Sequence, residues 1–164
     1  SSTVADATAD VEDKIGCTPL WTAAAHGHVD AVQYLIDRHG ASPNTRDVTG
    51  TTAAWMTAGS GNIQCLKALL DAGADGDLCN EDGLTPALIA AQGGHAGCLR
   101  ALAEAGADLS IRDLSGNSAA ALAAMGGHLS CLEVLDGEGA DLDVPNSDGH
   151  TAVFAAVTHC RLDC

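Results

Sequence analysis

Residues of the same type recur every 33 positions in this chain of 164 residues. Glycine recurs at Gly83, Gly116 and Gly149, and cysteine recurs at Cys65, Cys98, Cys131 and Cys164. A constant spacing of about 20 to 50 residues is typical of architectures in which small units stack in a row. The sequence therefore predicts a repeat array, and we expect any functional surface on the outside of that array.

The unit that begins at Gly83 shows how this spacing produces structure. Thr85 supplies the side-chain oxygen of a helix N-cap, and Pro86 suits the first helical position, where no amide hydrogen is needed. The short helix that they begin is predicted to end at Gly94. A second helix is predicted from residue 96 to Gly106, because apolar residues recur there at helical spacing. Residues 107–113 are expected to return, extended, to the next turn.

Several short motifs recur from unit to unit. The first unit contains Thr18-Pro19-Leu20, Ala23-Ala24, Gly27-His28 and Gly40-Ala41, and the later units contain Ala74-Asp75, Ala107-Asp108 and Ala140-Asp141. From about Asp10 to Cys164 this pattern resembles the ankyrin repeat. The resemblance implies an all-α fold, a solenoid of stacked helix-turn-helix units with hairpin loops.

The repeat boundaries divide the chain into one elongated domain of six segments. Residues 1–16 are predicted to be the tail of a preceding repeat, residues 17–49, 50–82, 83–115 and 116–148 are predicted to be complete repeats, and residues 149–164 a partial one. Both ends are expected to continue in a longer protein. Each predicted helix is shorter than the roughly 12 to 15 residues that an isolated helix needs, so stability must come from packing unit on unit.

Three departures from the family pattern carry expectations of their own. The pattern places histidine after Thr-Pro-Leu, but this chain has Trp21, Trp55, Leu88, Ala121 and Phe154. Apolar contact is expected to replace the usual imidazole bond, with both tryptophans buried against the next unit. The first unit is one residue longer near Arg38, which predicts a small bulge. In the fourth unit Asp136 and Gly137 predict that the second helix frays early.

The composition limits the classes of partner. Seven Lys and Arg residues stand against 22 Asp and Glu residues, which gives a formal net charge of −15. Such a charge repels phosphate backbones, so no nucleic-acid partner is expected. No apolar run reaches the roughly 20 residues of a membrane helix, so direct membrane insertion is not expected either.

The recurring cysteines are predicted to be small buried packing residues. The first unit has Ala31 at their position, and thiols on packed helices roughly 8 to 10 Å apart are too distant to pair. Reduced thiols imply an intracellular, cytoplasmic location. A thiol redox sensor stays open as an alternative, which rapid alkylation of the native Cys65, Cys98 or Cys131 would support.

No metal, cofactor or catalytic site is predicted. His159, Cys160 and Cys164 lack zinc-finger spacing, and the acidic segments 141–143 and 146–149 lack the ligand pattern of a calcium loop. His28, His95 and His128 share one repeat position, so they are expected to bond the backbone of an adjacent loop. We therefore predict no enzyme activity in this stretch and no small-molecule substrate.

A protein-binding surface is what remains, and the family resemblance places it on the hairpin tips and the inner helices. Residues at these positions differ from unit to unit while the framework is constant, as recognition requires. The candidate residues are Arg46, Val48, Glu81, Asp82, Leu84, Gln92, Arg112, Leu114, Met125, Asp148 and His150. Because the hairpins are acidic, the expected partner is another protein with a segment of basic character.

Two functional hypotheses remain open at this point. In the first the chain is a scaffold or adaptor that holds another protein, and in the second it is the targeting or regulatory arm of a larger enzyme or channel. Combined substitution of Arg46, Leu84, Arg112 and Leu114 is expected to weaken partner capture without unfolding the array.

Overall fold

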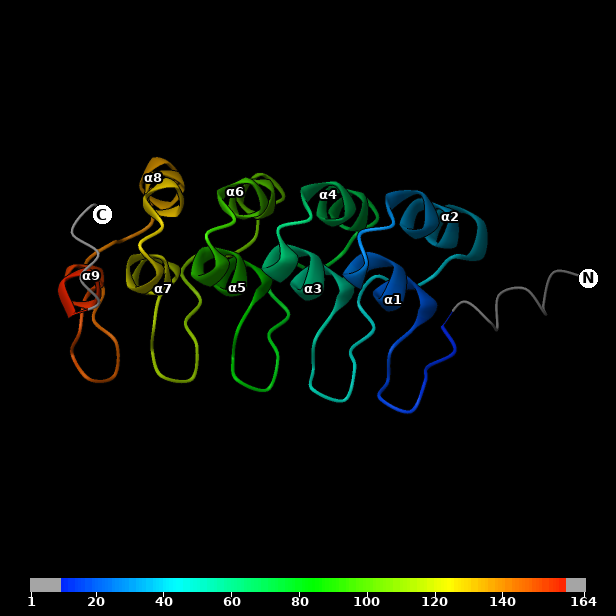
Figure 1. Ribbon diagram of the computed structural model, residues 1–164, viewed down its shortest axis with the longest axis horizontal. Helices are drawn as coiled ribbons and strands as arrows, with labels where there is room; N and C mark the ends of the chain where they lie inside the picture. Colours follow the sequence, from blue (N-terminus) through cyan, green and yellow to red (C-terminus); the bar gives the residue numbers. More distant parts are fainter. Residues whose placement is uncertain (1–9, 159–164) are drawn as a thin grey trace, which may run out of the picture.

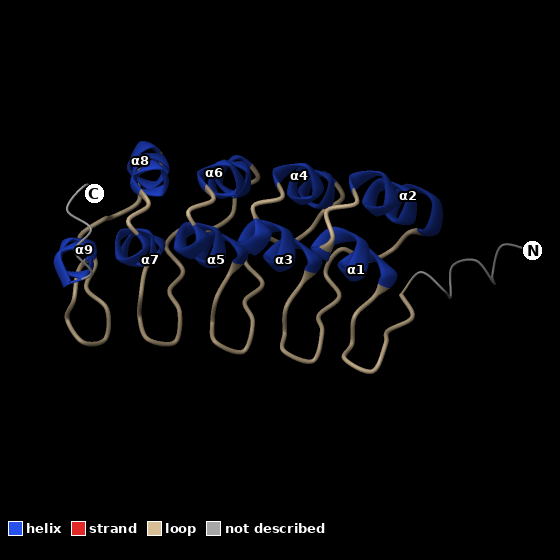
Figure 2. Cartoon of the chain, viewed as in Figure 1, coloured by secondary structure: helices blue, strands red, loops and turns tan. Residues whose placement is uncertain are grey.

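The computed structural model describes residues 10–158, which form nine helices and no strand. In chain order the helices are α1 Pro19–Ala25, α2 Val29–His39, α3 Ala53–Ser60, α4 Ile63–Asp71, α5 Pro86–Gly93, α6 Ala96–Glu104, α7 Ala119–Gly126, α8 Leu129–Gly137 and α9 Ala152–Thr158. The odd-numbered helices, called the inner helices below, form one row (Figure 1). The even-numbered helices α2, α4, α6 and α8, called the outer helices, form a second row. Long loops extend from the odd-numbered row on the side away from the second row (Figure 2). The predicted all-α solenoid is confirmed.

The inner helices begin and end as the sequence indicates. A hydroxyl at each N-cap accepts a hydrogen bond from an amide three residues on, at Thr18, Thr52, Thr85 and Ser118. Proline fills the first helical position of α1 and α5. Helix α5 ends at Gly94, which takes the left-handed conformation with φ of 77°. The predicted roles of Thr85, Pro86 and Gly94 are confirmed.

Leucine, alanine and cysteine fill the space between the two rows. Leu66, Leu99 and Leu102 are completely buried, in a cluster that runs through the middle repeats. Cys65 and Cys131 are also completely buried, and Cys98 is 1% exposed. Small residues let neighbouring helix pairs approach closely without leaving voids. The predicted packing role of the three recurring cysteines is therefore confirmed.

Two of the histidines that follow the recurring glycines join neighbouring units. Nε2 of His95 lies 3.0 Å from the carbonyl oxygen of Gly59, and Nε2 of His128 lies 3.0 Å from that of Gln92. Because a carbonyl oxygen only accepts, each Nε2 carries the hydrogen. The predicted bond to an adjacent loop is confirmed for these two histidines, whereas His28 stacks on His26 with ring centroids 6.0 Å apart.

Two predictions about helix length are wrong. The extra residue of the first unit makes no bulge, because α2 continues through Arg38 and His39 and ends at the left-handed Gly40. Helix α8 does not end early, since it extends to Gly137 and is nine residues long, as α4 and α6 are. Completely buried Leu135, one residue before Asp136, holds its last turn in the core.

The two tryptophans were expected to be buried against the next unit, and they are less buried than that. Both rings are half-buried. Nε1 of Trp55 donates a 2.9 Å hydrogen bond to the carbonyl oxygen of Leu84 in the following unit. Nε1 of Trp21 is buried and has no hydrogen-bond partner among the described residues.

Candidate protein-binding surface

Backbone hydrogen bonds connect the tips of neighbouring hairpins. The amides of Val48, Glu81, Leu114 and Ser147, spaced 33 residues apart, each donate to a carbonyl oxygen of the preceding hairpin over 3.1 to 3.2 Å. We call these four residues the tip row. All four side chains are exposed, and no two are the same. The tip row thus presents four different side chains from a backbone that is held in a regular ladder.

Each hairpin is also closed from within by an aspartate or asparagine. Oδ1 of Asp47 accepts hydrogen bonds from the amides of Thr49 and Thr51 at 2.9 and 2.8 Å. Burial raises the pKa of Asp47, but the hydrogen bonds from Thr51 and Thr49 outweigh it and lower this pKa below its ordinary value. The carboxylate is therefore ionised at neutral pH, where it stabilises the turn.

The two arginines at the hairpins contact the backbone of the next unit. The guanidinium of Arg46 donates to the carbonyl oxygen of Cys79, and its Nε donates to that of Gly50 over 3.1 Å. Nη1 of Arg112 donates to the carbonyl oxygen of Pro145 over 3.0 Å. Both side chains are exposed, but each also holds two hairpins together.

The other candidate residues fall into two groups. Glu81, Asp82, Leu114 and Asp148 are exposed at hairpin tips, and Gln92 is exposed near the end of α5. His150 is exposed and stacks on Phe154, with ring centroids 3.9 Å apart. In contrast, Leu84 and Met125 are half-buried and pack against the main core cluster. Their surface available to a partner is correspondingly smaller.

Exposed apolar side chains on α9 were not among the predicted candidates. Val153, Phe154 and Val157 are 64%, 45% and 59% exposed. The sequence signal was Phe154, an aromatic residue at the position where the family pattern places histidine.

The recurring thiols are poorly suited to redox chemistry. Each described cysteine is free. Burial raises the pKa of Cys98 to about 11, and burial together with nearby Cys98 raises the pKa of Cys131 to about 11. Because the thiolate is the nucleophile, these groups react slowly at neutral pH.

We expect an alkylating agent to distinguish these thiols in the native protein. Cys79, half-buried in a hairpin, should react at least about tenfold faster than Cys65, Cys98 and Cys131, because labelling of buried thiols requires local opening. Mass spectrometry of peptides after timed labelling measures each rate, and labelling in urea is the control in which the difference disappears. Fast native labelling of the buried thiols would instead favour the redox-sensor alternative.

Metal ligands do not gather within the described range. Residues 10–158 contain no group of three or more His, Cys, Asp or Glu side chains placed to hold a metal ion. The segment with His159, Cys160 and Cys164 lies outside that range. In the acidic loop, Oδ1 of Asn146 accepts from the amides of Asp148 and His150 at 3.0 and 2.9 Å, so it closes the turn.

Comparison with known families agrees with this geometry. The family model for ankyrin repeats in three copies matches residues 3–77 and again residues 39–113. The chain belongs to the ankyrin repeat family. Ankyrin repeats are in general protein–protein interaction modules and are typically non-catalytic. No curated protein matches the chain. Between residues 10 and 158 each helix is too short or too polar to cross a membrane.

Proposed function

We propose that this array is a scaffold or adaptor module that holds a basic segment of a partner protein against its hairpin tips and inner helices. The observation that carries the proposal is the tip row. Its backbone follows a ladder of hydrogen bonds, while its side chains are valine, glutamate, leucine and serine. A rigid backbone with varied exposed side chains reduces the entropy cost of binding and allows specificity.

Charge favours a basic partner. Glu81, Asp82 and Asp148 expose carboxylates at the hairpins, and the chain carries a formal net charge of −15. The guanidinium groups of Arg46 and Arg112 also lie at the hairpins, but the 22 Asp and Glu residues of the chain outnumber its seven Lys and Arg residues. A segment rich in lysine or arginine is therefore attracted to this side, and its binding should weaken as salt is added.

Apolar contact supplies the second component of the binding free energy. Val48 is 62% exposed and Leu114 is 78% exposed, which leaves apolar surface for a partner to cover. Burial of such side chains contributes roughly 25 cal/mol per Å² of apolar area removed from water. The partner segment is accordingly expected to combine basic residues with one or two apolar ones.

A peptide library displayed on phage and selected on the immobilised protein tests the proposal. Selected peptides should be rich in lysine and arginine, and the triple variant V48S/E81Q/L114S should bind them about tenfold or more weakly, as fluorescence anisotropy measures. The four-residue substitution suggested by sequence is less suitable, because Leu84 packs inside and both arginines hold neighbouring hairpins.

The matched control replaces one acidic and two apolar residues on the outer helices. Tyr34, Leu129 and Glu133 are exposed on α2 and α8, so Y34S/L129S/E133Q should leave peptide affinity unchanged. Equal loss in both variants, or selection of acidic peptides, would contradict the proposal. Circular dichroism must show the same helical content in all three proteins.

A further inference from the structure

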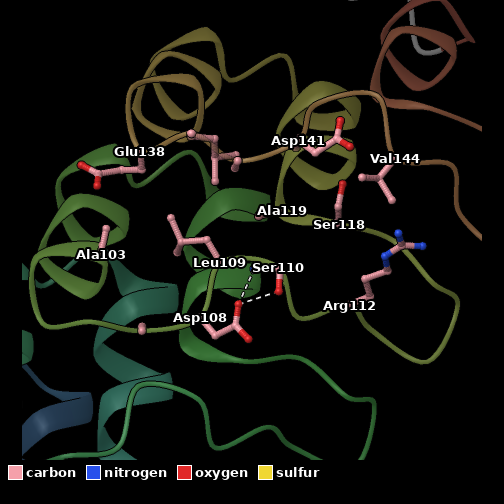
Figure 3. A pocket seen from close by; sticks show the side chains of 15 residues that line it. Ala103, Asp108, Leu109, Ser110, Arg112, Ser118, Ala119, Glu138, Asp141 and Val144 are labelled. Carbon is pink, nitrogen blue, oxygen red and sulfur yellow. Dashed lines mark hydrogen bonds between the residues drawn. The ribbon is translucent and has the colours of Figure 1, made fainter.

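A hollow of about 390 Å³ lies between the third and fourth repeats (Figure 3). Its walls come from the last turn of α6, the first turn of α7 and the end of α8, at Ala103, Ala119 and Leu135. The segments 107–112 and 138–144, which return from α6 and α8 to the hairpins, complete it. None of the tip-row residues lines this hollow.

The hollow lies where one small side chain, that of Ala103, stands in place of larger ones. The position of Ala103 is occupied by Ile36 and Leu70 in the two preceding units, and both pack against the core. Ala119 stands at the position of Pro86 one unit earlier, although the second unit also has an alanine there, Ala53. The larger side chain that the two preceding units have at the position of Ala103 is thus missing at this interface, which leaves space.

Among the described residues, a hydrogen bond that joins the earlier units has no counterpart at this interface. Oδ1 of Asn44 accepts from the amide of Asp75, and Oδ1 of Asp77 accepts from the amide of Asp108, each at 2.8 Å. At the corresponding place the Oγ of Ser110 instead donates to Asp108 in its own turn, over 2.6 Å. The segments 107–112 and 138–144 are therefore joined by one hydrogen bond fewer at the mouth of the hollow.

The lining combines an apolar interior with an acidic mouth. Alanine and leucine side chains form the interior, including Leu109 and Leu135. Asp108, Glu138 and Asp141 are exposed around it, and Arg112 lies across the hollow from Glu138 (Figure 3). Three carboxylates against one guanidinium leave the net charge at the mouth negative.

We propose that this hollow is a second docking site, which takes one large apolar side chain from a basic peptide segment whose flanking lysine or arginine pairs with Glu138 and Asp141. The volume lies at the lower end of the roughly 300 to 1,000 Å³ of pockets that enclose small ligands, which suits one aromatic or aliphatic side chain. The inference rests on the proposed function only in that the ligand is again a basic polypeptide, since it concerns a separate surface.

Nuclear magnetic resonance titration with capped tripeptides tests the second site. The probe Arg-Phe-Arg should shift the amide signals of Ala103, Leu109 and Ala140, and the matched probes Arg-Gly-Arg and Glu-Phe-Glu should not. Substituting A103L restores the larger side chain found at Leu70, so it should fill the hollow and weaken Arg-Phe-Arg binding about tenfold or more. Its melting temperature should equal or exceed that of the parent, which shows that the fold is intact.

A pair of charge variants distinguishes the effect of a carboxylate at the mouth on peptide binding from the effect of the overall negative charge of the chain. The variant E138Q should weaken Arg-Phe-Arg binding about two- to fivefold, whereas E104Q, which removes an exposed charge outside the hollow, should not. Unchanged binding in A103L, or shifts confined to the tip-row amides, would overturn the second site while leaving the proposed function standing. Loss of peptide binding in V48S/E81Q/L114S alone would likewise place the ligand at the tips.

Discussion

Replacement of Leu99 by alanine is expected to lower the free energy of unfolding by about 2 to 5 kcal/mol. Leu99 is completely buried in the core cluster between α6 and its neighbours. The substitution removes apolar contact and leaves a void that closely packed helices fill poorly. Urea titration followed by circular dichroism at 222 nm measures the change, with the midpoint falling and the slope unchanged.

Leu129 gives the matched control for this substitution. It lies on α8 and is 46% exposed, so L129A should change the free energy of unfolding by no more than about 0.5 kcal/mol. Similar losses in L99A and L129A would contradict the assignment of Leu99 to a core shared between repeats.

Replacement of Gly94 by alanine is expected to lower the free energy of unfolding by about 2 to 3 kcal/mol. Gly94 has φ of 77°, which strains any residue with a Cβ, and that Cβ would lie 2.5 Å from Nδ1 of His128. The ring would have to move, so the bond from His128 Nε2 to the carbonyl oxygen of Gln92 would be lost as well. Thermal and urea unfolding measure the combined effect.

Replacement of Gly106 by alanine is the control, because it introduces the backbone strain without a contact to a histidine. Gly106 has φ of 86°, and a Cβ added there meets nothing within 4 Å, so G106A should cost only about 1 to 2 kcal/mol. The difference between the two glycine variants then reports the His128 bond between repeats. Equal costs would show that this bond contributes nothing measurable.

Much of the fold was predictable because each local signal in the sequence agrees with the next. Thr85, Pro86 and Gly94 mark the limits of one helix, and the 33-residue period copies that arrangement along the chain. Repeat packing is local, since each unit contacts mainly its neighbours, so correct units give a correct array. The buried cysteines followed from the same period.

Predictions failed where neighbouring units override local propensity. Asp136 and Gly137 disfavour a helix, yet α8 reaches Gly137 because Leu135 is anchored in the core. The exposure of Arg46 was correctly expected, but its bond to Cys79 depends on a hairpin 33 residues away. Contacts of this kind depend on spatial register, which one unit read alone does not contain.

The hollow between the third and fourth repeats had a sequence signal that is visible only in an aligned column. Ile36, Leu70 and Ala103 share one position, and the decrease in size at Ala103 marks the space. Whether neighbouring atoms close such a space depends on packing, and here Ala119 is small as well.

An alanine scan of each exposed side chain between residues 10 and 158, with affinity measured for a basic peptide selected on the protein, tests whether the tip row is the binding surface. The largest losses of affinity are expected at Val48, Glu81 and Leu114, and substitutions on the outer helices α2, α4 and α6 should leave the affinity unchanged. Largest losses on those outer helices, with an unaffected tip row, would show that the tip row is not that surface.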